Sequence, residues 1–150
     1  MTVSIHRAGI DDLDAIAPLF DLYRQFYGQT ADAAIAREFI GERLRRGESA
    51  VLLARIDDAT VGFTQLFPSF SSVSAARTWV LNDLYVVAGA RRHGVAKALL
   101  QAAADFARGE GAIRLELETD HDNTGAQALY RRLGWQAYDG TLRFRLPLTA

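Results

Sequence analysis

The chain has 150 residues, enough for one domain with a buried core, and 49% of them are hydrophobic, which excludes wholesale disorder. Its 17 basic and 18 acidic residues leave a net charge of −1, so no overall field attracts it to nucleic acid or to an anionic membrane. It has no cysteine, which excludes disulfides, thiolate metal sites and a cysteine nucleophile, and we expect a cytoplasmic protein because the N-terminal MTVSIHRAGI lacks the apolar core of a signal peptide.

The first half of the chain predicts a half-buried strand, two helices and a β-hairpin. In chain order these elements cover residues 3–7, 11–26, 31–46, 50–56 and 61–67. Pro18 lies inside the first helical pattern and predicts a bend or a break there, whereas Gly47 ends the second helix. Residues 68–76 are mostly small, which predicts a loop with one exposed aromatic side chain, Phe70.

The second half predicts alternating strands and helices. They cover residues 79–87, 94–108, 112–119, 124–133, 135–138 and 141–146. Asp139-Gly140 is typical of a tight turn between the last two strands. A strand, a helix and a strand over 79–119 imply a right-handed crossover between two parallel strands. We therefore predict one α/β domain over residues 1–150, with a mixed, mostly antiparallel sheet flanked by helices in the order β-α-α-β-β-β-α-β-α-β-β.

One loop concentrates positive charge where a helix is predicted to begin. ARRHGVAKALL, residues 90–100, places two arginines and a histidine directly before Gly94. The first turn of a helix has unsatisfied N–H groups and a partial positive charge, so phosphate groups bind there, and glycine lets them approach the backbone. A solvated basic loop, in which the glycine only permits the turn, is the alternative. Neither a P-loop nor a G-x-G-x-x-G fingerprint is present.

Two motifs resemble those of one enzyme superfamily. The R-x-x-G-x-A pattern at 91–96 is similar to the acetyl-CoA-binding motif Q/R-x-x-G-x-G/A of the GNAT N-acetyltransferases, which also lies between a strand and a helix. NTGAQALYRRLGW, residues 123–135, resembles that family's N-x-x-A-x-x-L-Y-x-x-x-G-F/W segment. Both motifs occur in the expected order, and the predicted elements match the family's fold along the whole chain. The resemblance therefore implies a GNAT fold and an acetyl-CoA-dependent N-acetyltransferase.

The resemblance implies a set of residues that bind acetyl-CoA. In the family, backbone N–H groups of the loop hold the diphosphate, a bulge in the preceding strand pairs with the pantetheine arm, and an asparagine contacts that arm. The matching residues here are Leu84, Tyr85, Val86, Arg91, Arg92, His93, Gly94, Val95, Ala96, Lys97 and Asn123. A backbone N–H in the bulge, that of Val86, would stabilise the negative charge that develops on the thioester carbonyl oxygen.

The resemblance also implies three catalytic candidates. Tyr130 matches the tyrosine that protonates the departing CoA thiolate, although its spacing from neighbouring apolar residues also suits a core position. Glu118 matches a glutamate suspected as the general base in ribosomal-protein alanine acetyltransferases, and Asp83 is the rival base. Either acid can instead be an ordinary strand residue, because some family members use a chain of ordered water molecules.

No metal site is expected from these residues. Asp120-His121-Asp122 resembles a metal cluster only superficially, and a solvated turn explains it better. The three histidines are widely separated in the sequence, and the family that the chain resembles needs no metal.

The acceptor is the least specified part of the prediction. Tyr23, Phe26 and Tyr27, with Phe70, give the expected acceptor region an aromatic character that suits an apolar side chain or an amine cation, although Phe26 is more typical of a core. We predict a small amine or an amino-acid-like acceptor, because nothing indicates a peptide groove. A protein N-terminus or lysine is the alternative acceptor, and a non-catalytic acetyl-CoA-binding module is the alternative class. Relatives often dimerise, and the strand predicted over 141–146 is a candidate edge for a homodimer.

Overall fold

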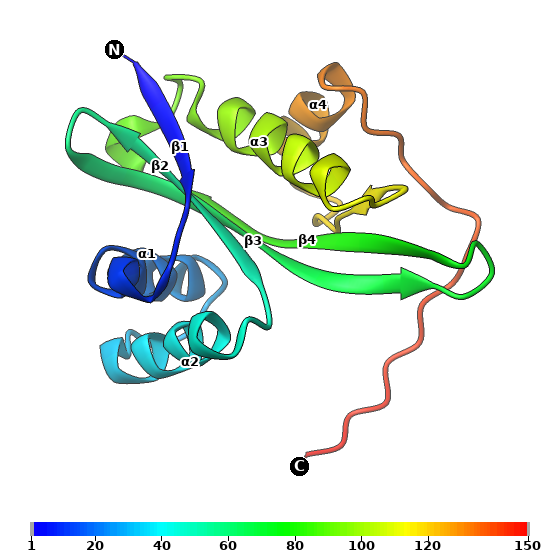
Figure 1. Ribbon diagram of the computed structural model, residues 1–150, viewed down its shortest axis with the longest axis horizontal. Coiled ribbons are helices and arrows are strands. Elements are labelled where there is room, and N and C mark those ends of the chain that lie inside the picture. Colours follow the sequence, from blue (N-terminus) through cyan, green and yellow to red (C-terminus); the bar gives the residue numbers. More distant parts are fainter. Residues whose placement is uncertain (1, 150) are drawn as a thin grey trace. The chain divides into compact units, whose positions relative to one another are not determined.

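The computed structural model describes residues 2–149, which fall into two compact units. The first unit extends to Glu118 and contains the β-sheet, and the second begins at Thr119 and contains one helix. The predicted fold class is confirmed, because the chain is α/β with a mixed, mostly antiparallel sheet flanked by helices (Figure 1).

The sheet of the first unit has five strands in the order β1-β2-β3-β4-β5. The strands are β1 (Val3–Arg7), β2 (Ala50–Ile56), β3 (Ala59–Ser71), β4 (Ala76–Val86) and β5 (Leu115–Glu116). The first four pair antiparallel, and β5 pairs with β4 in parallel. The crossover between the two parallel strands contains α3 (Val95–Gly109), as the strand–helix–strand pattern predicts.

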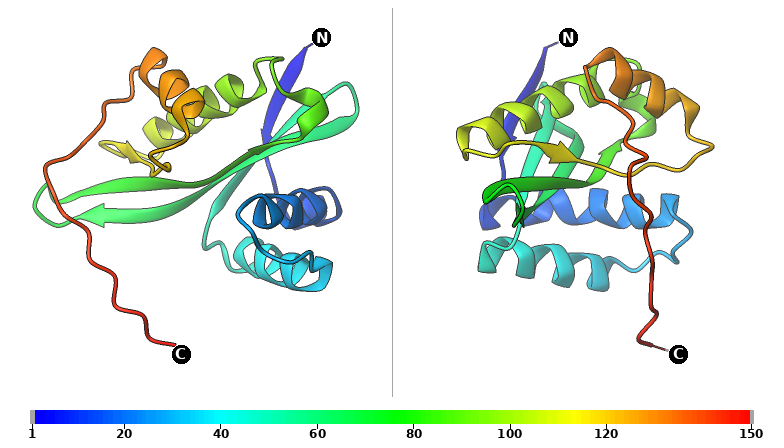
Figure 2. Two further views of the ribbon diagram at one scale, coloured as in Figure 1. Left: turned by 180° about the vertical axis from the view of Figure 1, so that it is seen from behind. Right: turned by 90° about the vertical axis from the view of Figure 1, so that its right-hand side faces the viewer.

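Helices cover both faces of this sheet. α1 (Leu13–Phe26) and α2 (Ala33–Arg46) lie on one face and α3 on the other, as Figures 1 and 2 show. The short 3-10 turn η1 (Ile10–Asp12) leads into α1, and α1 continues past Pro18 without a break. On either side of the proline, Ile16 and Phe20 are buried in the core that Phe63 of β3 completes, so packing outweighs the cost of the missing N–H.

The ends of α2 follow local rules that the sequence displays. The Asp32 side chain accepts a hydrogen bond from the backbone N–H of Ile35 at 3.0 Å and so caps the N-terminus. Gly47 follows the last helical residue with a φ of 63°, in the left-handed conformation that glycine adopts without strain.

The loop predicted over residues 68–76 is mostly strand, and this prediction was wrong. β3 and β4 continue beyond β2 as a two-stranded arm that pairs Phe70 with Arg77 and leaves only residues 72–75 as the turn. The guanidinium of Arg77 lies 4.2 Å from the centroid of the Phe70 ring, and this cation–π contact supports the arm. Pro68 is tolerated because it lies beyond Leu66, where the pairing of β3 with β2 ends.

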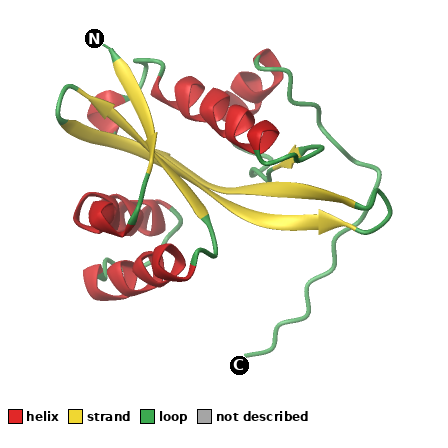
Figure 3. Cartoon of the chain, in the orientation of Figure 1, coloured by secondary structure: helices red, strands yellow, loops and turns green. Residues whose placement is uncertain are grey.

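The second unit contains α4 (Thr124–Arg132), and the two strands predicted after it are absent from the described residues. Residues 133–149 adopt neither helix nor strand, and Figure 3 draws them as a loop. A strand exists only when a ladder of hydrogen bonds pairs it, and alternation alone cannot supply the partner. The tight turn predicted at Asp139-Gly140 is also not formed, because the described backbone only bends at Gly140 and Thr141.

Candidate functional site

The basic loop forms an open N-terminus for α3. β4 ends at Val86, the short turn η2 (Ala88–Ala90) follows, and Gly94 occupies the N-cap of α3 with a φ of 76°. Gly94 has no side chain to cap the first turn, and a Cβ built there would meet nothing within 4 Å. The first-turn N–H groups are therefore left without a side-chain cap, which is the arrangement that binds phosphate groups.

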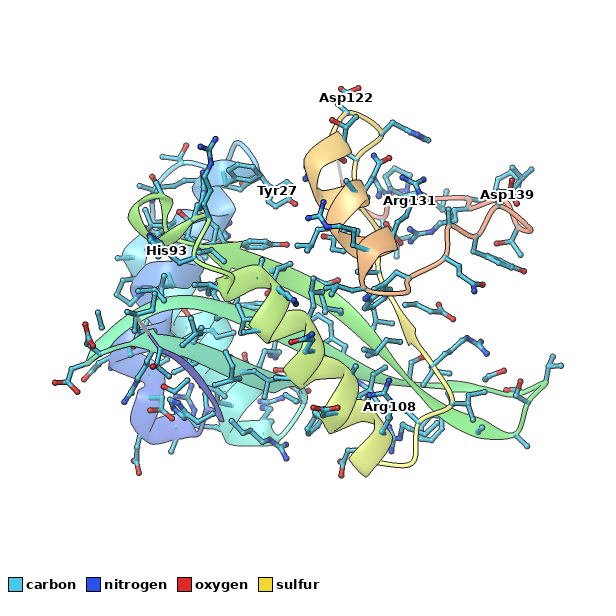
Figure 4. The ribbon with its side chains drawn as sticks, turned by 90° about the horizontal axis from the view of Figure 1, so that it is seen from above. Tyr27, His93, Arg108, Asp122, Arg131 and Asp139 are labelled. Carbon is cyan, nitrogen blue, oxygen red and sulfur yellow. The ribbon has the colours of Figure 1, made fainter. Side chains whose placement is uncertain are left out.

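Exposed positive charge surrounds this turn. The residues from Arg91 to Gly94 and Lys97 are exposed, and Figure 4 shows His93 at the N-terminal end of α3, with Arg108 at the opposite end. Arg92 holds a φ of 70°, an uncommon conformation for a residue with a side chain. Cations beside the positive end of a helix dipole repel it, so an anion bound here would relieve that repulsion.

Arg91 has a second contact, with the strand that precedes the loop. Its Nε donates a hydrogen bond to the backbone oxygen of Val86 at 3.1 Å. The backbone N–H of Val87 donates to Val61 of β3 at 2.9 Å. Because successive residues of a strand point their backbone groups to opposite sides, those of Val86 and Leu84 point away from β3. In the sheet as described, β5 pairs with β4 only at Trp79 and Val80. The outward backbone groups of Leu84 and Val86 therefore lie beyond the end of the parallel ladder.

Gly62 on β3 lets α3 approach the sheet, and the sequence reading missed it. A Cβ at this position would lie 2.9 Å from the backbone oxygen of Tyr85, 3.2 Å from Val95 and 3.3 Å from Leu99. Only glycine fits between the strand and the first turns of the helix, so Gly62 fixes where the anion-binding turn lies relative to β4. A glycine in the middle of an apolar strand pattern was the available signal.

The bulge of β4 lies earlier than predicted. Leu84, Tyr85 and Val86 were expected to form it, but they pair regularly with β3. The register shifts where Gln65 pairs with Asp83 and Leu66 with Leu81, which leaves Asn82 as the extra residue. The predicted contacts of Leu84, Tyr85 and Val86 with acetyl-CoA remain a prediction. The backbone groups of Leu84 and Val86 point away from β3 even though the bulge lies elsewhere.

Asp83 is the centre of a buried polar chain. Its carboxyl oxygens accept hydrogen bonds from Gln65 Nε2 at 2.6 Å and from Asn82 Nδ2 at 2.7 Å, and Gln65 in turn accepts one from Ser49 Oγ at 2.8 Å. Asp83 is 2% exposed. Burial raises the pKa of the Asp83 carboxyl above its ordinary value of 3.8, and the hydrogen bonds from Asn82, Gln65 and Tyr23 oppose this rise.

We expect Asp83→Asn to change how stability depends on pH. A carboxyl whose pKa is raised in the folded state favours folding fully below its unfolded pKa, and that contribution is lost as the pH rises through the folded pKa. The free energy of unfolding of the wild type should therefore fall, relative to that of the variant, from about pH 4 upward. Urea unfolding at a series of pH values measures this difference. Asp58→Asn, at an exposed turn, controls for the lost charge, and parallel pH curves for Asp83→Asn and the wild type would contradict the expectation.

Aromatic side chains gather at the end of α1. The ring centroids of Tyr23 and Tyr27 are 5.1 Å apart, and those of Phe26 and Tyr27 are 5.2 Å apart. The expectation that Phe26 belongs to the core was wrong, because it is 62% exposed. Phe70 does not join this cluster, since it lies on the β3–β4 arm. The Tyr23 hydroxyl donates a hydrogen bond to the backbone oxygen of Asn82 at 3.3 Å, which connects the cluster to the bulge.

The second unit holds two of the predicted site residues. The side-chain oxygen of Asn123 accepts a hydrogen bond from the backbone N–H of Ala126 at 3.3 Å, so this asparagine caps α4. Tyr130 is half-buried, with its ring centroid 6.1 Å from that of Trp135. Figure 4 labels Asp122 in the turn before α4, Arg131 near its C-terminal end and Asp139 in the segment beyond. Among residues 2–149, no three His, Cys, Asp or Glu side chains cluster as a metal site requires.

None of the helices described is long and apolar enough to span a membrane.

The sequence and the fold are both similar to those of acetyltransferases. A model of the acetyltransferase (GNAT) family matches residues 16–135. The chain is 43% identical over 148 residues to the uncharacterised N-acetyltransferase YhfO of Bacillus subtilis (strain 168), and this alignment covers 99% of each chain. It is 28% identical over 113 residues to an aminoglycoside N(6')-acetyltransferase type 1 of Klebsiella aerogenes, covering 74% of each chain. A crystal structure of a probable acetyltransferase superposes with a TM-score of 0.92 at 42% identity, over 98% of this chain and 99% of that one.

Proposed function

Because the chain belongs to the GNAT family of acetyltransferases, we propose that it transfers the acetyl group of acetyl-CoA directly to the primary amine of a small molecule. One observation carries this proposal: the uncapped first turn of α3, with exposed cations around it, lies next to a strand whose outward backbone groups extend beyond the parallel ladder. A diphosphate and an amide-containing arm are the two chemical features that such a turn and such a strand edge bind.

The residues present fit acetyl-CoA. The backbone N–H groups from Arg92 to Lys97 would hold its diphosphate, since the space in front of Gly94 is open. Leu84 and Val86 would pair with its pantetheine arm as a neighbouring strand does. Arg91 already donates a hydrogen bond to Val86, so it would brace the strand end as well as add positive charge. Acetyl-CoA supplies an activated thioester.

Each proton in the transfer is assigned to a side chain of this protein. Glu118, exposed at the end of the first unit, takes a proton from the acceptor's ammonium, and the freed lone pair forms the new N–C bond. The Val86 N–H stabilises the negative charge on the carbonyl oxygen, and donors of this kind contribute about 3 kcal/mol. As the C–S bond breaks, the Tyr130 hydroxyl donates a proton to the sulfur, and the Tyr130 phenolate then accepts the second proton that the acceptor nitrogen releases as the amide forms. Asn123 contacts the pantetheine arm while it caps α4.

Asp83 suits a structural role better than that of the base. Both of its carboxyl oxygens already accept hydrogen bonds from neighbouring amides, and the residue is 2% exposed. A base must reach the proton that it removes, either directly or through one water molecule. We assign Asp83 to holding the bulge at Asn82, and Glu118 to the proton transfer.

The acceptor proposal rests on the aromatic cluster of α1. Tyr23, Phe26 and Tyr27 present ring faces that attract an amine cation, and two of the three are more than half exposed. The Klebsiella aerogenes relative is named for an aminoglycoside, a small molecule with amino groups. The cluster suits an amine cation of any kind, and the name of this relative favours a small amine over a protein N-terminus or lysine.

The test is CoA release with a panel of acceptors. We expect turnover with acetyl-CoA and one or more aminoglycosides, polyamines or amino acids, followed by the appearance of free thiol. The chain has no cysteine, so a thiol reagent reports only CoA. Peptides with a free N-terminus or a lysine form the comparison set. Turnover restricted to these peptides would contradict the small-molecule assignment, and no turnover with any amine would contradict the proposed reaction.

A further inference from the structure

Gln65 of β3 is a buried polar side chain that the proposed reaction does not use. It is 1% exposed and lies on the same strand as the buried apolar residues Phe63 and Leu66. A buried amide costs free energy unless its donor and its acceptor are both paired. On the basis of the acetyl transfer proposed above, we propose that Gln65 is a positioning residue: it holds the bulge of β4, and through it the aromatic cluster of α1, in the geometry that the transfer requires.

The amide of Gln65 connects Ser49, directly before β2, to Asp83 of β4. Its oxygen Oε1 accepts a hydrogen bond from Ser49 Oγ at 2.8 Å, and its nitrogen Nε2 donates one to Oδ2 of Asp83 at 2.6 Å. Ser49 and Asp83 are 7% and 2% exposed, so water does not compete for these bonds. The Ser49 hydroxyl therefore favours the rotation of the amide that presents its nitrogen to the carboxyl group.

Gln65 lies opposite the point at which β4 gains its extra residue. The register shifts directly after the Gln65–Asp83 pair and leaves Asn82 as the bulge. The other carboxyl oxygen of Asp83 accepts a hydrogen bond from Asn82 Nδ2 at 2.7 Å, and its backbone oxygen accepts one from Thr64 Oγ1 at 2.7 Å. Paired polar groups at defined places select one register among those that apolar side chains alone would allow. The bond from Gln65 to Asp83 therefore ties the bulge to position 82.

The bulge is connected to both halves of the proposed site. The Tyr23 hydroxyl donates a hydrogen bond to the backbone oxygen of Asn82 at 3.3 Å, and the ring centroids of Tyr23 and Tyr27 are 5.1 Å apart. Leu84, whose outward backbone groups are proposed to hold the pantetheine arm, follows the bulge by two residues. A displacement of about 1 Å between two reactants can cost roughly 100-fold in rate. Loss of the Gln65–Asp83 bond should therefore slow the transfer although neither side chain touches the acceptor.

The test is a double-mutant cycle that reverses the polarity of this bond. In Gln65→Glu two carboxyl groups face each other, and in Asp83→Asn the one amide oxygen cannot accept from both Gln65 and Asn82. The double variant Gln65→Glu/Asp83→Asn restores the chain, because the introduced asparagine donates to the introduced glutamate and still accepts from Asn82. Ser49 can donate to the side chain at position 65 in every variant.

The measured quantity is kcat/KM for the amine, at a temperature at which circular dichroism shows all four proteins folded. Each single variant should lower it by about tenfold or more, and the double variant should return it to within about threefold of the wild type. In folded protein, a side chain that only adds stability would leave kcat/KM unchanged. An unchanged kcat/KM in Gln65→Glu would therefore overturn the proposal.

The cycle also separates positioning from the rival role of Asp83 as the general base. A double variant as slow as Asp83→Asn would show that the carboxyl group itself is needed at position 83, and the role of Gln65 would be refuted. If the wild type acetylates no amine, the proposed reaction fails by itself, and amide hydrogen exchange over residues 82–86 then tests the bulge. Exchange should be faster in both single variants and return in the double variant, whereas equal exchange in all four proteins would contradict the role of Gln65.

Discussion

Tyr130→Phe is expected to lower kcat by about 100- to 10,000-fold, the usual contribution of one general acid. The departing thiolate would then leave without a proton donor, while the first turn of α3, which belongs to the first unit, is unchanged. The phenylalanine ring keeps the packing against Trp135, whose ring centroid lies 6.1 Å away. The measurement is CoA release at saturating acceptor, with acetyl-CoA binding followed separately by calorimetry.

The matched control is Tyr138→Phe in the same unit. Tyr138 is 79% exposed, so the loss of its hydroxyl should leave kcat within about twofold of the wild type. Equal losses in both variants would indicate a general effect on the second unit. An unchanged kcat in Tyr130→Phe would leave the assigned proton to water and contradict the role of Tyr130.

Gly94→Asp is expected to abolish acetyl-CoA binding. A carboxylate beside a diphosphate costs several kcal/mol, which corresponds to a loss of affinity of about 100-fold or more. In the wild type, acetyl-CoA at a hundredfold excess over Kd should stabilise the fold by about 2.7 kcal/mol. That stabilisation corresponds to a rise in Tm of roughly 2–8 °C for domains near this size. A thermal-shift titration measures both proteins directly.

Gly94→Asn separates charge from shape in this experiment. Asparagine and aspartate have nearly the same size, and both tolerate the positive φ of this position. Gly94→Asn should therefore keep most of the shift that Gly94→Asp loses. Equal losses in the two variants would point to a steric effect, and a full shift in Gly94→Asp would place the diphosphate elsewhere.

The elements that the sequence predicts well are those with local causes. The helical spacing that buries Ile16 and Phe20 and the left-handed glycine at position 47 are each contained in a short window of the sequence. The β3–β4 arm was missed because its small residues are typical of a loop, and only cross-strand pairing, as between Phe70 and Arg77, makes them strand.

The strands predicted after α4 illustrate the opposite error. Apolar residues do alternate with other residues over 141–146. This alternation indicates that the segment prefers an extended conformation, but it does not indicate which strand the segment pairs with. The bulge was misplaced for a related reason. Asn82 becomes the extra residue through the register between two strands, and a single strand does not display that register.

A motif in the sequence indicates one part of the candidate site, and long-range packing forms another part that no motif indicates. The loop from Arg91 to Lys97 begins a helix as the motif requires, and its N-cap is open. Gly62 and Tyr23 have no motif, because their importance comes from neighbours far away in the sequence, the first turns of α3 and the backbone of Asn82. The placement of Tyr130 and Glu118 in catalysis remains a prediction.

The bulge at Asn82 constrains how the length of β4 can change during evolution. Side chains of a regular strand alternate, so residues 79 and 83 should face the same side. Instead Trp79 packs on Phe106 of α3, whereas Asp83 bonds to Gln65, which lies on the same side of β3 as Phe63, a residue that packs on Phe20 of α1. The extra residue therefore exchanges the two faces of the sheet to which the side chains after it point. Loss of one residue here would turn Asp83 towards α3, whereas insertions or deletions of two residues would keep Asp83 on its present face of the sheet.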